Sequence, residues 1–364
     1  MKAAVLYSAG EPLKIEELEI PKPQVGEVLV KLVATGVCHT DYAPYSGDMP
    51  VPPPIVLGHE GAGIVEEIGP GVTLVKPGDH VILFVLPSCG KCRQCIIGKP
   101  YLCEPVSEVL LGGTMMDGTT RLKKKDGTPI NTFFCQSSFA EYAVVYESAA
   151  IKVSDDIPLD KVCVLSCGVS TGIGALVNKA KVTVGSTVAV IGCGGVGQSA
   201  IVGANLCNAS KIIAIDVADN KLKFAKEIGA THTINSAKEG VMERIQAIAP
   251  GGVDYAFECI GKPATVVLAL DCVRFGGTAV VVGMVPWGTT VGIDAMFLLF
   301  DKTLTGCIGG STRARVDIPG WVDLYKAGKI PLDKMITRTY KLEQVNEALE
   351  AMEKGEVIRS VILF

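Results

Sequence analysis

The chain lacks an excess of basic residues. Its 364 residues include 34 Lys and Arg against 38 Asp and Glu, which gives a formal net charge of -4. This balance argues against partners that are bound mainly through phosphates, such as nucleic acids or anionic membranes. The chain also lacks an apolar run long enough to span a membrane, and residues 1–18 lack the continuous apolar core of a signal peptide. We therefore expect a cytoplasmic protein with no nucleic-acid partner and no membrane partner.

The length of the chain and the changes in residue pattern along it predict two domains. With 364 residues, of which 48% are hydrophobic, the chain is too long for one ordinary core. Residues 1–168 carry short β-like runs separated by Pro-Gly turns, which is typical of an all-β, barrel-like domain. Between residues 169 and 308, strands alternate with helix-length stretches, which indicates a parallel α/β sheet. The last stretch, 309–364, returns to mixed character, with a helix-like segment at 343–353 and a strand-like end.

A glycine-rich motif follows the first strand expected in the middle region. The six expected strands cover residues 187–191, 212–216, 231–235, 254–259, 278–282 and 303–307. The first leads into Gly192-Cys-Gly-Gly-Val-Gly197, which matches G-x-G-x-x-G, and a helical stretch follows at 198–206. Gly192 permits the tight turn, Gly194 lets the backbone approach a pyrophosphate, and Gly197 lets helix and strand pack closely. The N–H groups and partial positive charge of the helix N-terminus would hold the phosphates.

The second expected strand ends in an acid, Asp216, at the distance typical of a dinucleotide site. Its carboxylate could accept hydrogen bonds from both hydroxyls of the adenosine ribose, and its charge would repel a 2′-phosphate. We therefore expect NAD as the cofactor rather than NADP. Lys221, one helical turn later, could hydrogen-bond the same ribose. The alternative is a structural glycine turn followed by a surface acid.

Four of the thirteen cysteines stand close together in the sequence, at spacings that suit a metal. They are Cys89, Cys92, Cys95 and Cys103. Three thiolates at two-residue gaps can wrap one ion, and the fourth can close a tetrahedron. Four protein ligands leave no open position, so we expect a structural zinc. Unpaired surface cysteines are one alternative, and a nucleic-acid zinc knuckle, for which the segment has few basic residues, is another.

A second metal site is possible from residues that are dispersed along the chain. A catalytic zinc needs three protein ligands and one open position for the substrate. The candidates are Cys38, His59 and Cys167. Spacing alone leaves the alternative that these are small buried residues and a core histidine.

Several motifs, in order over nearly the whole chain, resemble the zinc-dependent alcohol dehydrogenases of the medium-chain dehydrogenase/reductase superfamily. They are Gly36-Val-Cys-His-Thr-Asp41, Gly58-His-Glu-x2-Gly63-x5-Gly69-x2-Val72, the four-cysteine segment, residues 113–121, residues 163–172 and the terminal Ser-Val-Ile-Leu-Phe. The resemblance implies a GroES-like catalytic domain at 1–168, to which 309–364 returns. It also implies a Rossmann NAD-binding domain at 169–308, with a doubly wound parallel sheet.

The same resemblance implies roles for the residues of the metal site. Cys38, His59 and Cys167 would be the catalytic zinc ligands, and Glu60 would be a transient ligand beside them. Zinc would act as a Lewis acid that lowers the pKa of the bound alcohol, and hydride would pass from the resulting alkoxide to NAD. Thr40 would accept the alcohol proton. We expect two zinc ions per chain, one catalytic and one structural.

The resemblance further implies contacts with the cofactor. Thr171 and Val196 would press on the nicotinamide, and the backbone of residues 282–284 would hold its carboxamide. Arg359 would bind the pyrophosphate, with a solvated surface cation as the alternative. The expected cofactor-binding residues are His39, Thr171, Gly192, Gly194, Gly195, Val196, Gly197, Asp216, Lys221, Val282, Gly283, Met284 and Arg359.

Three positions depart from the family pattern. Ala43 stands where many relatives have a histidine at the outer end of the proton relay. His39 stands where many have an arginine on the pyrophosphate; a histidine is only partly charged near neutral pH, so weaker cofactor binding is expected. Val106 stands near the place of an arginine that binds the carboxylate of a glutathione adduct, which argues against that substrate.

We therefore expect an NAD-dependent enzyme that oxidises a primary, hydrophobic or aromatic alcohol to the aldehyde, reversibly. The expected pocket walls are apolar, although each is equally explicable as core: Met49, Val85, Phe134, Met284 and Ile308. The alternatives are a thiol-adduct formaldehyde dehydrogenase and a non-catalytic zinc-binding protein of the same fold. By resemblance, a homodimer or homotetramer is expected.

Overall fold

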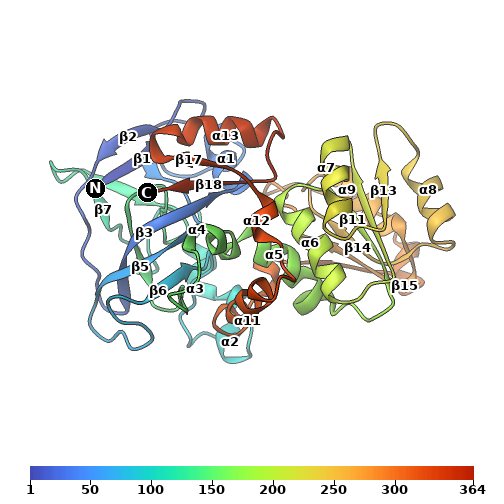
Figure 1. Ribbon diagram of the computed structural model, residues 1–364, viewed down its shortest axis with the longest axis horizontal. Coiled ribbons are helices and arrows are strands. Elements are labelled where there is room, and N and C mark those ends of the chain that lie inside the picture. The colour runs from blue at the N-terminus through green and yellow to red at the C-terminus, as the bar shows by residue number, and fades with distance from the viewer. The chain divides into compact units, whose positions relative to one another are not determined.

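The computed structural model describes residues 1–364 and divides the chain into two compact units. The first unit joins Met1–Cys167 to Arg313–Phe364, and the second is Gly168–Thr312 (Figure 1). The sequence-based boundary at 308/309 lies four residues earlier than this division. Residues 309–312 belong to the second unit because the turn at Gly309–Ser311 packs on the helix that opens it.

The first unit is built mainly from strands. Its strands are β1 (Lys2–Leu6), β2 (Lys14–Glu17), β3 (Glu27–Val37), β4 (Ile55–Val56), β5 (Gly61–Ile68), β6 (His80–Leu83), β7 (Leu122–Lys123), β8 (Pro129–Thr132), β9 (Tyr142–Tyr146), β10 (Ala150–Val153), β17 (Ile336–Lys341) and β18 (Arg359–Leu363). Its helices are α1 (His39–Ser46), α2 (Arg93–Ile96), α3 (Glu104–Val109), α4 (Leu159–Val162), α11 (Ala314–Lys326), α12 (Leu332–Met335) and α13 (Val345–Glu353).

Strand β3 organises the larger sheet of the first unit. This sheet has seven strands in the order β10-β6-β5-β3-β18-β17, and β9 also pairs with β3. β-Branched residues such as Val28 and Val30 favour this extended conformation, and both are fully buried. Their core cluster includes side chains from β5, β6 and β9, so β3 is packed from several sides. A strand held this firmly gives the loop after Val37 a rigid base.

The second unit is an open parallel sheet. Its strands are β11 (Thr187–Ile191), β12 (Lys211–Asp216), β13 (His232–Asn235), β14 (Val253–Glu258), β15 (Val273–Val281) and β16 (Thr303–Gly306). Its helices are α5 (Gly168–Gly174), which continues into a wide turn at Ala175–Ala180, α6 (Gly195–Leu206), α7 (Asp219–Glu227), α8 (Val241–Ile248), α9 (Pro263–Cys272) and α10 (Met296–Leu299). These elements confirm the expected α/β fold class.

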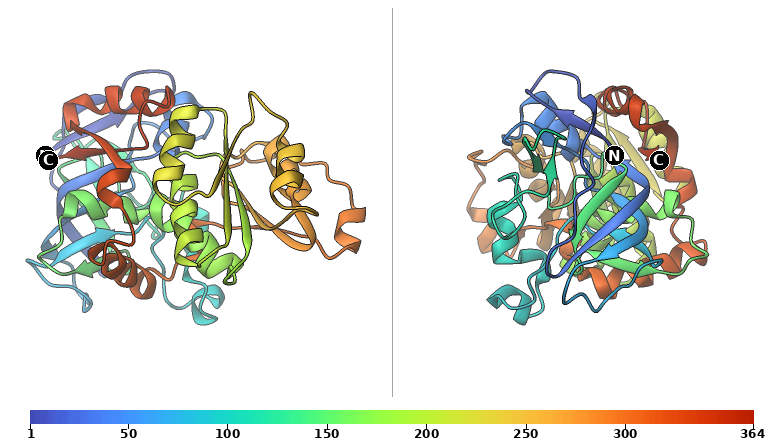
Figure 2. Two further views of the ribbon diagram at one scale, coloured as in Figure 1. Left: turned by 45° about the vertical axis from the view of Figure 1, so that its right-hand side comes forward. Right: turned by 90° about the vertical axis from the view of Figure 1, so that its left-hand side faces the viewer.

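The strand order places a switch point in the middle of this sheet. The order is β13-β12-β11-β14-β15-β16, and every neighbouring pair is parallel. Helices lie on both faces (Figure 2), which explains why residues of the central strands, such as Val188 and Ala256, are fully buried. The chain winds one way from β11 to β13 and the other way from β14 to β16. Ligands of such sheets bind at the carboxyl ends of the strands where the direction changes.

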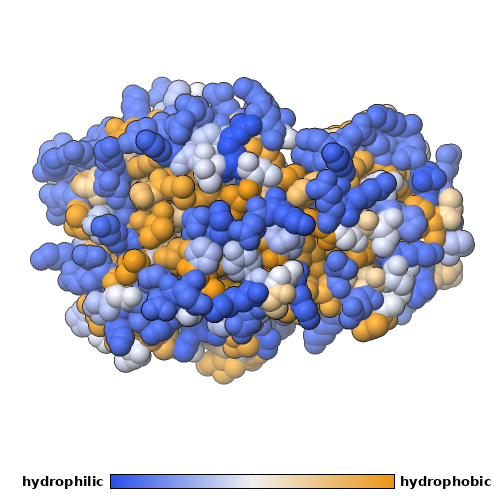
Figure 3. All heavy atoms as spheres, viewed as in Figure 1, coloured by the Kyte–Doolittle hydropathy of each residue, from blue (hydrophilic) through white to orange (hydrophobic).

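Three further features of the chain concern its ends, its surface and the length of its apolar helices. The two chain ends lie close together in the first unit, as Figures 1 and 2 both show. The face in Figure 3 is mostly hydrophilic, with apolar side chains in small groups. No single helix is long and apolar enough to cross a membrane; Leu159–Ser166 and Gly168–Ala180 pass such a test only together, as a bent pair.

A buried ion pair ties the start of β3 to the loop before β7. Arg121 Nε lies 2.9 Å and Nη2 lies 2.6 Å from the two carboxylate oxygens of Glu27. Their side chains are only 6% and 1% exposed. The guanidinium also pairs with Asp117 at 2.7 Å, and these carboxylates raise the pKa of Arg121 although burial alone would lower it. Removing one member of such a pair leaves an uncompensated charge in the core.

Replacing Arg121 with Met is therefore expected to destabilise the protein by about 3–5 kcal/mol, because Glu27 stays buried without its cation. The free energy of unfolding would be measured by urea titration. Arg338→Met is the control, since Arg338 pairs with Glu356 at the surface, where such a pair contributes at most about 1 kcal/mol. Equal losses in the two variants would show that the buried pair of Arg121 and Glu27 contributes no more than the surface pair.

Candidate metal and nucleotide sites

The structure brings the dispersed metal-ligand candidates together. One ligand atom from each of Cys38, His59, Glu60 and Cys167 lies within 4.8 Å of the others. Cys38 precedes α1 directly after β3, His59 and Glu60 precede β5, and Cys167 precedes α5. The Nε2 atom of His59 is buried and has no hydrogen-bond partner, so it is available as a metal ligand. These residues fit a zinc ion with two sulfur ligands and one nitrogen ligand.

A buried carboxylate, Asp41, holds this cluster in place. Its Oδ1 lies 2.7 Å from His59 Nδ1 and accepts the Gly58 N–H at 3.1 Å, and its Oδ2 accepts the Cys38 N–H at 3.0 Å. A proton on Nδ1 leaves Nε2 with a free lone pair for the metal. Sequence reasoning missed this role of Asp41. The signal was present, since the acid follows the ligand Cys38 by three residues in the quoted motif.

The protonation of the cluster suits a divalent cation. A hydrogen bond from Cys167 holds the pKa of the Cys38 thiol well below its usual value, although burial opposes this. The same bond, together with burial, raises the pKa of Cys167 well above its usual value. Burial alone would lower the pKa of His59, but Asp41 and the Cys38 sulfur raise it well above the ordinary range. The group thus collects negative charge and holds protons that a bound cation would displace.

Arg359 lies beside the metal cluster. Its Nη2 forms an ion pair with Glu60 Oε2, and the two side chains are 4% and 0% exposed. This burial makes the alternative of a solvated surface cation wrong, because Arg359 opens strand β18, next to the central β3. Burial would lower the pKa of Arg359, but Glu60 and Cys38 raise it above its usual value. Binding of Arg359 to the pyrophosphate stays a prediction, whereas its ion pair with Glu60 is observed in the structure.

The other predicted residues of this region lie on α1. Thr40 Oγ1 is 3.8 Å from Cys38 Sγ, which places its hydroxyl beside the metal cluster. His39 is exposed and its ring lies 5.7 Å from that of Tyr42. Ala43 is 8% exposed, so the position that departs from the family pattern is enclosed and offers no proton acceptor.

Aromatic rings cover one side of the metal histidine. The ring centroids of Phe133 and Phe134 lie 5.8 and 5.3 Å from that of His59. Phe134 and the following Cys135 both have a φ of 51°, a conformation that costs non-glycine residues free energy. Hydrogen bonds hold this loop in place, including one of 2.8 Å from the Gly61 N–H to Gln136 Oε1. The loop therefore fixes Phe134 as a wall beside the metal site.

The remaining pocket candidates divide between the two units. Met49 and Val85 are buried in the first unit at 7% and 4% exposure. Met284 and Ile308 belong to the second unit, where they are 55% and 45% exposed. Burial thus leaves the alternative of core packing open for Met49 and Val85. It excludes that alternative for Met284 and Ile308 within their own unit.

The four-cysteine segment also forms a compact cluster. One sulfur from each of Cys89, Cys92, Cys95 and Cys103 lies within 4.8 Å of the others. Backbone N–H groups point at the sulfurs, as in the 3.2 Å bond from Cys89 N to Cys103 Sγ. Such bonds lower the pKa of Cys92 to about 6, while burial raises that of Cys95 to about 12. The donor set fits zinc and leaves no position for a substrate.

The glycine motif lies where the sequence placed it, at the carboxyl end of β11. Gly192 has a φ of 91°, and a Cβ at Gly197 would overlap the carbonyl of Gly192, so both positions require glycine. A Cβ at Gly194 would meet nothing within 4 Å, so the backbone there is open to a ligand. No side chain caps the N-terminus of α6. The partly exposed residues 194–196 thus form a cradle that fits a pyrophosphate.

Asp216 stands beside this cradle but already has partners. Its Oδ2 accepts the Cys193 N–H at 2.7 Å, and its Oδ1 accepts the Ala218 N–H at 2.9 Å. Each carboxylate oxygen keeps a second lone pair, which suits two ribose hydroxyls. Gln198 joins the same region, since its amide donates to the carbonyls of Cys193 and Lys221. Asp216 therefore orients the phosphate turn in addition to its expected role on the ribose.

The two other predicted cofactor segments are also in the second unit. Thr171 lies in α5 and is 8% exposed. The N–H groups of Val282 and Gly283 donate to the carbonyl of Glu258 at 2.8 and 2.9 Å. Because these two donors are used within the fold, they are not free to bind a carboxamide.

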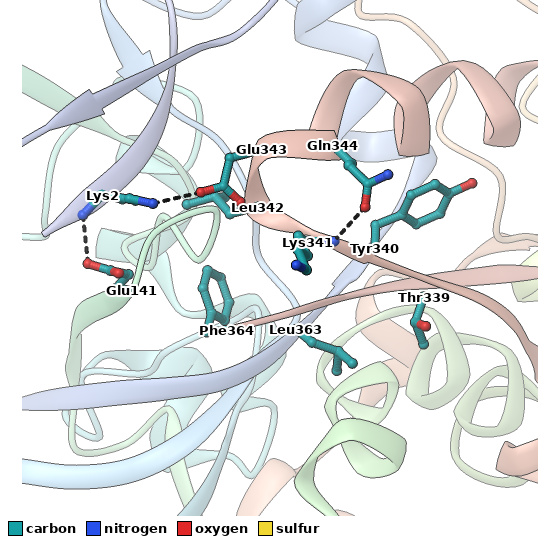
Figure 4. A pocket seen from close by; sticks show the side chains of 10 residues that line it. All are labelled: Lys2, Glu141, Thr339, Tyr340, Lys341, Leu342, Glu343, Gln344, Leu363 and Phe364. Atoms are coloured by element: carbon teal, nitrogen blue, oxygen red, sulfur yellow. Dashed lines mark hydrogen bonds and ion pairs between the residues drawn. The ribbon is translucent and has the colours of Figure 1, made fainter.

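A cavity of about 530 Å³ lies in a different part of the first unit. Its lining comes from β1, the residue before β9, β17 with the following turn, and the end of β18 (Figure 4), and it includes Lys2, Glu141, Tyr340, Glu343, Leu363 and Phe364. Lys2 is held there by Glu343 at 2.8 Å and, through its backbone N–H, by Glu141 at 2.7 Å. None of the metal or nucleotide candidates lines this cavity, and two of its charged side chains, Lys2 and Glu343, pair with each other.

Comparisons with known proteins cover the whole chain. Residues 24–155 match the family model "Alcohol dehydrogenase GroES-like domain", and residues 195–327 match "Zinc-binding dehydrogenase". The S-(hydroxymethyl)glutathione dehydrogenase of Paracoccus denitrificans is 42% identical, over 100% of this chain and 99% of that protein. A benzyl alcohol dehydrogenase structure from Acinetobacter calcoaceticus is 40% identical with a TM-score of 0.95, over 100% and 99% of the two chains. An alcohol dehydrogenase zinc-binding domain protein from Burkholderia ambifaria is 41% identical with a TM-score of 0.96, over 100% and 98%.

The chain therefore belongs to the zinc-dependent alcohol dehydrogenases of the medium-chain dehydrogenase/reductase superfamily, with a GroES-like and a Rossmann domain. Within that superfamily it is an alcohol dehydrogenase, an oxidoreductase that depends on zinc and a nicotinamide cofactor. The alternative of a non-catalytic zinc-binding protein is set aside.

Replacing Asp41 with Asn is expected to weaken zinc binding at the Cys38–His59–Cys167 cluster by about 10- to 100-fold, because the His59 ring loses the carboxylate that orients it. Zinc occupancy would be measured in buffers of defined free zinc. Asp48→Asn is the matched control, since Asp48 is exposed and bonds only to Ser46. Unchanged occupancy in Asp41→Asn would show that the imidazole is held by other means.

Proposed function

We propose that the chain oxidises a primary, hydrophobic or aromatic alcohol to its aldehyde with NAD, and catalyses the reverse reaction. The observation that carries the proposal is the buried cluster of Cys38, His59 and Cys167, in which His59 Nε2 has no partner. Three ligands leave one coordination position open for a substrate, unlike the four-cysteine cluster. We expect one zinc in each cluster and therefore two per chain.

The groups of the chain have distinct tasks in this reaction. When bound, zinc supplies Lewis acidity and NAD accepts the hydride. Asp41 keeps the His59 ring in the tautomer that presents Nε2. Thr40, with its hydroxyl beside Cys38, accepts the proton of the substrate hydroxyl. Ala43 offers no group to carry this proton further.

Glu60 and Arg359 form a buried ion pair beside the metal ligands. Glu60 is the transient ligand of the proposal, because one of its oxygens lies within 4.8 Å of the other ligand atoms. Arg359 neutralises its carboxylate when Glu60 is away from the metal. His39, exposed on α1 where an arginine would carry a permanent charge, makes cofactor binding weaker and release easier.

The substrate preference rests on the walls of the metal site. The Phe134 ring lies beside that of His59, and Met49 and Val85 add apolar surface in the same unit. Val106, which is 2% exposed within α3, offers no charge to a carboxylate. The similarity to a benzyl alcohol dehydrogenase supports an aromatic alcohol. The similarity to an S-(hydroxymethyl)glutathione dehydrogenase favours a thiol-adduct alcohol as the second candidate.

A homodimer or homotetramer is part of the proposal. The second unit exposes several large apolar side chains, which a partner surface would cover. They include Phe275 at 63%, Trp287 at 86%, Leu299 at 78% and Phe300 at 47% exposure.

A turnover panel tests the substrate. Ethanol, hexanol, benzyl alcohol, a secondary alcohol and a sugar alcohol would be compared with NAD, alongside formaldehyde with and without glutathione. We expect the largest kcat/KM for hexanol or benzyl alcohol, because an apolar substrate gains binding free energy when it is buried against apolar pocket walls. Glutathione-dependent formaldehyde turnover above all alcohols would establish the second candidate instead, and best activity on the sugar alcohol would defeat both.

Replacing Asp216 with Ser is expected to raise KM for NAD by about tenfold or more, because the ribose hydroxyls lose their charged acceptor. The relative use of NADP is expected to improve, because the charge that repels a 2′-phosphate is lost. Initial rates with both cofactors would be measured. Asp219→Asn is the matched control, since Asp219 is exposed and pairs with Lys238. A cofactor preference that is unchanged in Asp216→Ser would refute its role on the ribose.

A further inference from the structure

Glu258 is a buried acid that the proposed chemistry does not use. It is the last residue of β14 and is 0% exposed. Its Oε1 accepts three hydrogen bonds, from the N–H of Ile260 at 2.8 Å, the N–H of Gly261 at 2.7 Å and the hydroxyl of Thr265 at 2.8 Å. Three donors on one oxygen bind the loop after β14 tightly, because hydrogen bonds to a charged acceptor are the stronger ones.

The backbone of the same residue binds a second loop. Its carbonyl accepts the N–H groups of Val282 and Gly283, which follow β15. A Cβ at Gly283 would overlap the backbone nitrogen of Gly261, and a Cβ at Gly261 would overlap the backbone of Met284. The two loops therefore lie backbone against backbone, and Glu258 fixes both. The other carboxylate oxygen, Oε2, is buried and has no partner among the groups of the chain.

The topology of the sheet shows which half of a dinucleotide these loops would meet. Asp216 ends β12 on one side of the switch point, and the glycine turn follows β11. With the adenosine ribose at Asp216 and the pyrophosphate at the glycine turn, the nucleotide must continue across the carboxyl ends of β14 and β15. The loop after β14 also touches the phosphate turn, because a Cβ at Gly192 would overlap the side chain of Ile260.

We propose that Glu258 is a positioning residue for the nicotinamide half of the cofactor, which it orients through the loops at 259–261 and 282–284. This inference rests on the proposed function, since it assumes a dinucleotide at the switch point. It assigns the carboxylate a task in binding the nicotinamide half, and none in binding the adenosine or the pyrophosphate. The second carboxylate oxygen of Glu258, Oε2, can accept one further hydrogen bond, since no group of the chain donates to it.

The test separates the two halves of the cofactor. Glu258→Gln removes the charge but keeps the shape and one acceptor oxygen. Dissociation constants would be measured for NADH by fluorescence and for ADP-ribose, which lacks the nicotinamide, by calorimetry; kcat and the KM for NAD would be measured as well. We expect NADH to bind roughly tenfold more weakly and kcat to fall, because a neutral oxygen holds the loops less firmly than the carboxylate does, and loosely held loops misplace the reacting ring. We expect ADP-ribose to bind within about twofold of the wild type.

Asp254→Asn is the matched control. Asp254 stands at the opposite end of the same strand, where its carboxylate also accepts a backbone N–H, that of Thr187 at 2.7 Å. The same exchange of carboxylate for amide there should leave both dissociation constants unchanged. If Glu258→Gln fails to fold, Thr265→Val removes one donor from Oε1 and should weaken NADH alone, while Thr265→Ser, which keeps the hydroxyl, should restore its binding.

Each remaining outcome overturns the inference. Equal weakening of NADH and ADP-ribose would make Glu258 a general structural residue, and unchanged binding of both would leave it without a role in either half. Failure of the wild-type protein to bind ADP-ribose and NADH would refute the proposed function itself. That result is distinguishable, because it appears before any variant is compared.

Discussion

The metal centre depends on one buried carboxylate. Asp41 binds the His59 ring with one oxygen and the backbone at Cys38 and Gly58 with both, so it joins the loop after β3 to the loop before β5. Those loops carry three of the four clustered ligand candidates. A carboxylate is costly to bury, and burial does raise the pKa of Asp41 despite the opposing effect of His59. This free-energy cost is offset because the Asp41 carboxylate fixes the spacing of the ligands and the orientation of the His59 imidazole.

In the second unit, too, carboxylates hold the loops at the carboxyl ends of the strands. Glycines at the carboxyl end of β11 let the chain turn closely, and acids at the ends of β12 and β14 then hold the turns and loops. Asp216 and Glu258 each accept backbone N–H groups with a side-chain oxygen. Charged acceptors thus replace regular backbone pairing where the strands end. Each of the two units keeps its chemically active groups on loops that a rigid sheet supports.

The sequence predicted the fold well because its signals are local. The runs at 187–191 and 212–216 are continuous and apolar, and they form β11 and β12 almost to the residue. The helix expected at 198–206 begins three residues earlier as α6, because the glycines of the motif are already helical. Strand β15 begins five residues before the expected 278, since exposed and glycine-containing positions at its start hid the extended conformation.

The metal site could be predicted only in part. Four cysteines in a row of short spacings define their own cluster, but Cys38, His59 and Cys167 come together only through the pairing of β3 with β5 and the turn before α5. No periodicity encodes such distant neighbours, so they were found by resemblance. The ion pair of Arg359 with Glu60 joins residues 299 positions apart and depends on β18 lying beside β3. Asp41 and Glu258 were missed because a buried acid looks in sequence like any surface acid.

The place of β18 also has a consequence for the order in which the protein forms during synthesis. Because β18 completes the sheet around β3, the first unit stays open at its centre while the second unit, which lies entirely within the intervening chain, can already fold. Arg359 is synthesised after the whole of the second unit, and until it arrives Glu60 has no buried cation beside it. It follows that the ion pair beside the metal ligands forms only after the whole second unit has been synthesised, so that the nucleotide-binding half can fold as an insert before the surroundings of the metal ligands are complete.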